Sequence, residues 1–121
     1  MKTRQFTLAV AAASMMGGAA FAQGTWVEIE DTIQVPTFEA TVDQIDDWDV
    51  SNVGGSVIGE VEEVVGTDAN TPTALVIDLE GNEGYADRDV VVPFDQFTLD
   101  GDRLTLRADP AAAAQMEEWS D

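Results

Sequence analysis

Carboxylates are the side chains of this sequence that could most readily do chemistry, and several lie in adjacent or near-adjacent pairs. Two suitably placed acids can hydrolyse a glycosidic bond, one as general acid and the other as base or nucleophile. The chain has 24 Asp and Glu residues among 121, however, so such pairs arise by composition alone. A solvated acidic surface explains them better than an active site. The pairs are Asp46 and Asp47, Glu62 and Glu63, Asp87 and Asp89, and Glu117 and Glu118.

Residues 78–89 have oxygen donors at the spacing of a calcium-binding loop. The first, third, fifth and twelfth places of an EF-hand loop are occupied by Asp78, Glu80, Asn82 and Asp89. The sixth place is Glu83, where that loop needs glycine, and the flanking sequence favours strands. We therefore expect no specific metal-binding residue here, and weak cation association with the acidic surface is the alternative.

The sequence contains no cysteine and no histidine. This absence excludes a cysteine nucleophile, a Ser-His-Asp triad and a zinc site built on imidazole. An enzyme would also need a pocket, which the short loops of this chain do not favour. We expect a protein that is not an enzyme and has neither catalytic nor cofactor-binding residues.

The first 22 residues have the features of a secretory signal peptide. Lys2 and Arg4 form a positive start, and residues 6–20 are apolar and rich in alanine. Ala20-Phe21-Ala22 then places small residues at the two positions that signal peptidase reads. The apolar run is shorter than the ~20 residues of a membrane-spanning helix. We expect cleavage after Ala22, no stable membrane insertion afterwards, and a periplasmic or secreted protein.

Negative charge dominates the chain. The net charge is −19, and it becomes −21 without residues 1–22, which hold Lys2 and Arg4 but no acid. Nucleic acids and anionic membranes require cationic binding surfaces, so neither is expected as a partner. An acidic surface suits a salty environment, and it attracts basic molecules. Any partner is therefore expected to be a cationic protein or peptide.

Residues 23–40 are expected to form an extended N-terminal arm, followed by a domain at residues 41–121. Apolar residues of the arm fall on alternate positions up to Pro36, which is typical of extended chain. Trp26 and Phe38 have two equally favoured roles. They either anchor a partner, or they pack onto the domain and cover a sheet edge.

A short helix is expected next. Thr41 and Gln44 have the spacing of a capping box, in which each side chain binds the backbone N–H of the other. Val42, Ile45 and Trp48 then lie on one helical face, which favours core packing over a binding site.

The following strand does not alternate simply. Ile58, Val61 and Val64 recur every three residues, and Gly59 predicts a bulge that shifts the phase. Thr73–Leu79 is expected to be a strand buried on at least one face. Its inward side chains are Leu75, Ile77 and Leu79.

Asp100-Gly101 between alternating segments predicts a β-hairpin. With these two residues as the loop, Leu99 pairs with Asp102 and Phe97 with Leu104. The apolar residues that share one face are then Phe97, Leu99, Leu104 and Leu106.

A short helix should end the domain. Asp109 is expected at its N-cap and Pro110 at its first helical position. Ala112, Met116 and Trp119 would form its apolar face against the barrel.

The order of these elements resembles the PRC-barrel family. The resemblance covers residues 41–106 and lies in Ile58-Gly59-Glu60-Val61, in Val90-Val91-Val92-Pro93 and in the aromatic corner at Phe94 and Phe97. This small barrel is shared by the cytoplasmic domain of the photosynthetic reaction-centre H subunit and by a ribosome maturation factor. The resemblance implies an all-β PRC-type barrel with an extended N-terminal arm and a short C-terminal helix. It also implies a noncatalytic scaffold that binds other macromolecules.

Relatives often carry an apolar Phe-Leu-Gly element where this chain has Asn82-Glu83-Gly84. A contact made through that apolar loop is therefore not expected here. We expect an exported noncatalytic PRC-barrel module for protein interaction or structural support. An acidic calcium- or cation-binding periplasmic protein is the alternative.

Overall fold

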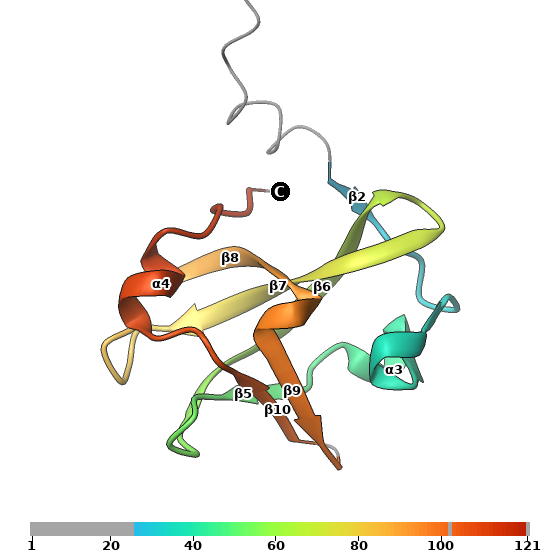
Figure 1. The fold of residues 1–121 in the computed structure, drawn as a ribbon. Coiled ribbons are helices and arrows are strands. Elements are labelled where there is room, and N and C mark those ends of the chain that lie inside the picture. Colours follow the sequence, from blue (N-terminus) through green and yellow to red (C-terminus); the bar gives the residue numbers. More distant parts are fainter. Residues whose placement is uncertain (1–25, 102, 121) are drawn as a thin grey trace, which may run out of the picture.

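The computed structural model describes residues 26–101 and 103–120, which form a mostly β structure curled around one core (Figure 1). Its strands are β2 (Val27–Glu28), β3 (Gln34–Val35), β4 (Ala40–Thr41), β5 (Asp49–Ser51), β6 (Val57–Asp68), β7 (Thr71–Glu80), β8 (Asp87–Pro93), β9 (Phe97–Asp100) and β10 (Arg103–Leu106). Its short helices are η2 (Pro36–Phe38), α3 (Val42–Ile45), η3 (Phe94–Gln96) and α4 (Pro110–Ala114). The expected all-β fold with a short C-terminal helix is confirmed.

One sheet runs in the order β8-β7-β6-β5-β10-β9, and β2 pairs with the later half of β6. Neighbouring strands are antiparallel, except that β5 and β10 are parallel. The sheet curls, so strands from both of its ends contribute to the same apolar core. The largest fully buried side chains of that core include Ile45, Ile58, Leu75, Ile77, Leu79, Leu104 and Leu106.

The pairing of β6 shifts against both of its neighbours. The register with β5 shifts beside Gly59, which confirms the expected bulge. The register with β7 shifts again between Val61 and Glu63. A bulge changes the face on which the next side chain lies. As a result Ile58, Val61 and Val64 are all buried in the main core, although they are three residues apart.

Two glycines of β6 allow the backbone of β7 to approach closely. A Cβ atom at Gly66 would lie 1.9 Å from the carbonyl oxygen of Thr71, and one at Gly59 would lie 2.3 Å from that of Asp78. The obstructing atoms are backbone atoms of a paired strand, which cannot move without breaking the ladder. A larger residue at Gly66 is therefore incompatible with the β6–β7 pairing.

Hairpin β9–β10 forms, but its predicted register is wrong. Leu99 pairs with Leu104 rather than with Asp102. Phe97 pairs with Leu106 rather than with Leu104. The observed register places apolar side chains opposite one another, which is more favourable than leucine opposite aspartate. The loop glycine, at φ 67°, takes the first loop position instead of the second.

The segment before β5 packs onto the barrel. The predicted capping box is confirmed, with Thr41 N donating to Gln44 Oε1 at 2.8 Å and Gln44 N to Thr41 Oγ1 at 3.3 Å. Ile29, Val35 and Phe38 of the arm are buried in the main core, and β2 covers an edge of β6. Of the two roles considered for the arm, the described residues thus show edge covering, and Phe38 is too buried to serve as an exposed anchor.

Helix α4 begins as predicted, but its predicted apolar face is wrong. The Asp109 side chain accepts a hydrogen bond from Ala112 N at 2.8 Å, with proline at the first helical position. The buried residue of the helix is Ala113 instead of Ala112, which is exposed. The helix is short, so Met116 and Trp119 lie beyond its end and pack on two different apolar clusters.

Arg88 of β8 holds the end of α4. Its Nη2 donates to the carbonyl oxygens of Ala113, Ala114 and Met116, at 3.4, 3.3 and 2.8 Å. A cation at this end of a helix is favourable, because the last carbonyl groups carry partial negative charge.

Both ends of the domain meet on the outer face of β6, β7 and β8 (Figure 1). The C-terminal segment follows the edge of β8, with Val91 N donating to Glu117 O at 2.8 Å and Trp119 N to Asp89 O at 2.9 Å. The indole N–H of Trp26 donates to Glu117 Oε1 at 2.9 Å. The two tryptophans pack on a second apolar group, here called the outer cluster, made of Val65, Ala74, Val76 and Val91.

The predicted signal peptide, residues 1–22, lies outside the described residues, so its cleavage stays a prediction. Within the described part of the chain, no helix has the length and apolar character that crossing a membrane requires.

Candidate functional site

The outer face of β6, β7 and β8 has an apolar half and an acidic half. Alternate residues of a strand share a face, so Asp78 follows Val76 on the outer side of β7, and Asp89 precedes Val91 on that of β8. Glu62 of β6 completes the acidic half. The carboxylates therefore begin where the outer cluster ends.

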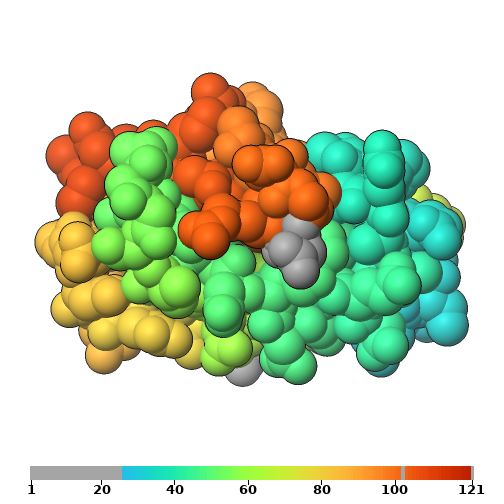
Figure 2. All heavy atoms as spheres, turned by 90° about the horizontal axis from the view of Figure 1, so that it is seen from below, coloured from blue at the N-terminus to red at the C-terminus, as the bar shows by residue number. Residues whose placement is uncertain are grey.

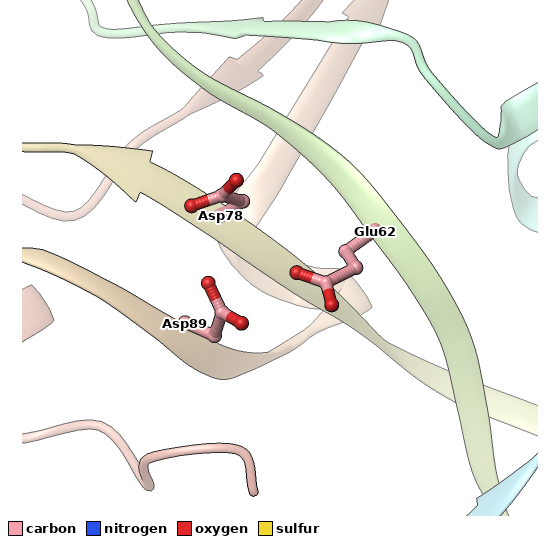
Figure 3. Close-up of side chains that lie close together, drawn as sticks. All are labelled: Glu62, Asp78 and Asp89. Atoms are coloured by element: carbon pink, nitrogen blue, oxygen red, sulfur yellow. The ribbon is translucent and has the colours of Figure 1, made fainter. Parts of the chain in front are cut away.

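These three carboxylates point toward one another, one from each strand (Figure 3). An oxygen atom of each lies within 4.8 Å of the others, and all three side chains are half-buried. Asp78 and Asp89 are direct partners in the β7–β8 register, where like charges are destabilising. Glu62 joins them because the bulge inserts it between the residues paired with Ile77 and Val76.

Asp78 holds a proton more readily than an isolated aspartate does. Burial raises the pKa of Asp78 above its ordinary value, and a hydrogen bond to the Asp89 side chain raises it further. The negative charges of Asp89, Glu60 and Glu80 act in the same direction. A hydrogen bond between two carboxyl groups requires one of them to carry the proton. The same oxygens are of the kind that hold Ca²⁺ or Mg²⁺.

The oxygen donors of residues 78–89 have the spacing of a calcium loop for a different structural reason. Asp78 and Glu80 belong to β7 and Asp89 to β8, so these donors lie on paired strands rather than around a loop. In the connecting turn, Asn82 Nδ2 donates to Val57 O at 2.9 Å. The first and twelfth places of the pattern meet because they are cross-strand neighbours. Sequence reasoning missed Glu62, because only the bulge and the sheet register bring it to the cluster.

The remaining carboxylate pairs are dispersed. Asp46 and Asp47 follow α3, where burial raises the pKa of Asp46 and the charges of Asp31, Asp47 and Asp43 raise it further. Glu117 accepts the hydrogen bond from the indole N–H of Trp26. The acids near α3 therefore repel one another.

Two hollows open on the surface, although the short loops did not favour any. One of about 510 Å³ is lined by Glu28, Ile29, Glu30, Asp31, Thr32 and Glu63. The other, here called the β5 pocket, has about 430 Å³ and is lined by Asp47, Trp48, Asp49, Ser51, Gly55, Val57 and Arg103. In the sequence, the Asp47-Trp48-Asp49 run is the signal that could have indicated this pocket. From the sequence, Trp48 is assigned to core packing alone.

The curled sheet and its order of elements have a counterpart among known families. The family model of the PRC-barrel domain matches residues 38–113. The chain belongs to the PRC-barrel domain family. The match runs from η2 to α4 and includes every strand of the main sheet except β2, which confirms the resemblance seen in the sequence. No curated protein matches the chain.

Membership of the PRC-barrel family bears on the site in two ways. PRC-barrel domains are typically noncatalytic, which agrees with carboxylates that lie on an outer sheet face instead of in a substrate cleft. In this PRC barrel the β7–β8 turn carries Asn82-Glu83-Gly84, all of them exposed. An apolar contact through that turn is therefore not available.

Replacing Asp78 by asparagine should stabilise the PRC barrel at pH 7. The change Asp78→Asn removes a like charge opposite Asp89 and keeps a hydrogen-bond donor, so we expect a gain of about 0.5–1 kcal/mol. A carboxyl whose pKa is higher in the folded state opposes folding once it ionises, because the folded state then loses the more tightly held proton. Stability of the unmodified protein should thus fall as pH rises above the ordinary value of 3.8.

Urea denaturation between about pH 4 and pH 8 measures this effect. The decline in the free energy of unfolding should be smaller for Asp78→Asn. Asp68→Asn, an exposed acid at the end of β6, is the matched control and should follow the unmodified protein. Identical pH dependence in Asp78→Asn and the unmodified protein would contradict the proposed coupling of the carboxylates.

Proposed function

We propose that this PRC-barrel domain is an exported, noncatalytic module for protein interaction or structural support. Its membership of the PRC-barrel family carries the proposal, because domains of this family are typically noncatalytic. The interior of the curled sheet supports it, since apolar side chains fill the space between the strands. The absence of histidine and cysteine from the sequence is consistent with this role.

Export is the second part of the proposal. The basic start at Lys2 and Arg4, the apolar residues 6–20 and the small residues around Phe21 support a cleaved signal peptide and a periplasmic or secreted product. The protein isolated from its host should then begin at Gln23. An intact mass that retains residues 1–22 would refute export with cleavage.

The partner that fits such a module is a cationic protein or peptide. After cleavage the net charge is −21, and two of the three remaining arginines donate to backbone carbonyl oxygens of the barrel itself. Charge of this sign attracts basic molecules and speeds their association, while it disfavours nucleic acid and anionic membranes.

Crosslinking capture from a periplasmic extract at about 0.15 M salt, where the Debye length is about 8 Å, tests the proposal. The bait is the protein purified after export, and the matched control is Gly66→Val, which has the same charge but cannot form the β6–β7 pairing. We expect a cationic protein to be recovered with the folded bait and lost with the control. Equal recovery with both baits, or recovery with neither, would contradict an interaction through the folded barrel.

A second candidate, an acidic calcium- or cation-binding periplasmic protein, is favoured by the arrangement of Glu62, Asp78 and Asp89. In that case calcium should raise the melting temperature more than magnesium does at equal ionic strength. Asp78→Asn should abolish the difference and Asp68→Asn should preserve it. The interaction module requires no difference between the two cations.

A further inference from the structure

The β5 pocket lies on a different face of the PRC barrel from the one that Trp26 and Trp119 cover. The outer cluster of β6–β8 is occupied by Trp26 and Trp119, whereas the pocket lies between β5, the β5–β6 turn and β10. Figure 2 shows this side, with the green residues of β5 and its turn beside the orange residues of β9 and β10. Its volume of about 430 Å³ is within the range of binding sites for small groups.

The two acids of the pocket are held on a fixed backbone. Asp47 N donates to Val61 O at 3.2 Å, and Val61 N donates to Trp48 O at 2.9 Å, so β6 anchors both residues. Asp47 has φ 75°, a left-handed conformation that aspartate and asparagine adopt more readily than most residues. Asp49 is exposed at the start of β5. Asp49 is itself paired with Glu60, so β6 fixes the backbone that carries both carboxylates.

Trp48 gives the pocket an aromatic wall. The ring of half-buried Trp48 packs edge-on against Phe38, with centroids 6.4 Å apart and planes at 77°, and Trp48 is one of the residues that line the pocket. The face of an indole attracts a cation, and nearby carboxylates strengthen that preference. Tryptophan is also among the residues most enriched at the energetic centres of protein interfaces.

Two exposed valines lie in and next to the turn that borders the pocket. Val53 in the β5–β6 turn is 76% exposed and Val57 at the start of β6 is 44% exposed. They are the two most exposed large apolar side chains of the described residues. An aromatic side chain close to exposed apolar groups, with charged groups nearby, is a combination found on protein-binding surfaces.

We propose that the β5 pocket binds a lysine or arginine side chain of a partner protein. The cationic group lies between Asp47 and Asp49 against Trp48, and apolar neighbours on the partner contact Val53 and Val57. The inference rests on the proposed function, because it states where the interaction module holds its cationic partner.

Removing the positive charge of Arg103 should have the opposite effect on cation binding from removing the acids. Arg103 lies beside Asp49, because the parallel β5–β10 register places Leu104 opposite Val50, and it also lines the pocket. A guanidinium in the pocket opposes the binding of a second cation. Arg103→Gln should therefore strengthen cation binding, whereas loss of the acids should weaken it.

NMR titration of isotope-labelled protein, purified after export, with a capped Gly-Lys-Gly-Lys-Gly peptide at about 0.15 M salt tests the pocket directly. The largest shift changes should occur at the Trp48 indole N–H and at the amides of Asp47, Asp49 and Gly55. The same peptide with glutamate in place of lysine should not bind.

The variants separate the pocket from the general charge. Asp47→Asn/Asp49→Asn should weaken binding about fivefold, and Arg103→Gln should tighten it about twofold, as expected for exposed charge pairs. Glu28→Gln/Asp68→Asn makes the same change of net charge at the other end of β6 and should weaken binding less than about twofold.

Each outcome decides between the two levels of the proposal. Peptide binding that shifts other residues, or that both double variants weaken equally, would overturn the pocket and leave the interaction module standing. Absence of peptide binding to the unmodified protein would overturn the pocket, while crosslinking capture independently decides the module. Thermal melting of each variant confirms that it is folded.

Discussion

Strand β7 is buried on both of its faces, and the rest of the structure follows from the need to cover them. Residues 74–77 have no exposed surface. The inner face is covered when the sheet curls, but the outer face needs a second layer, which the two chain ends supply through Trp26 and Trp119. Full burial of a side chain such as valine stabilises the folded state by about 1.5–3 kcal/mol. If the outer cluster were exposed to water, the folded state would lose several contributions of this size.

This cover also determines where charge is placed on the barrel. Trp26 and Trp119 pack on only part of β6–β8, and Glu62, Asp78 and Asp89 lie at outward positions beyond that part. Water reaches these half-buried carboxylates, yet burial and the neighbouring Asp89 make Asp78 harder to ionise. On the side of the barrel at β5 and β10, an aromatic side chain, exposed apolar groups and charged groups lie together away from this face. The proposed interaction module would need such a surface more than a deep cleft.

The features that sequence reasoning predicted correctly are local ones. The capping box at Thr41 and the N-cap at Asp109 depend on residues three positions apart, and the inward face of β7 depends on simple alternation. The errors and omissions depend on pairing between distant segments. Gly101 indicated a hairpin, but it allowed two registers of β9 against β10. Glu62 meets Asp89 only because β6 bulges against β7 and because β7 pairs with β8 in the observed register. The β5 pocket was missed for the same reason, since Arg103 reaches it through a parallel pairing that no local pattern predicts.

Amide hydrogen exchange tests most directly whether Trp26 and the segment from Glu117 to Trp119 form one layer over β7. In Trp26→Ala only the N-terminal side of that layer changes. If the layer is continuous, the amides of Val91 and Trp119, which join β8 to the C-terminal segment, should exchange about tenfold faster, as expected for the loss of a hydrogen bond to a charged group. The Arg107 amide, which donates to Gln96 O elsewhere in the barrel, should be unaffected. Unchanged exchange at Val91 and Trp119, or equal acceleration at Arg107, would contradict the account.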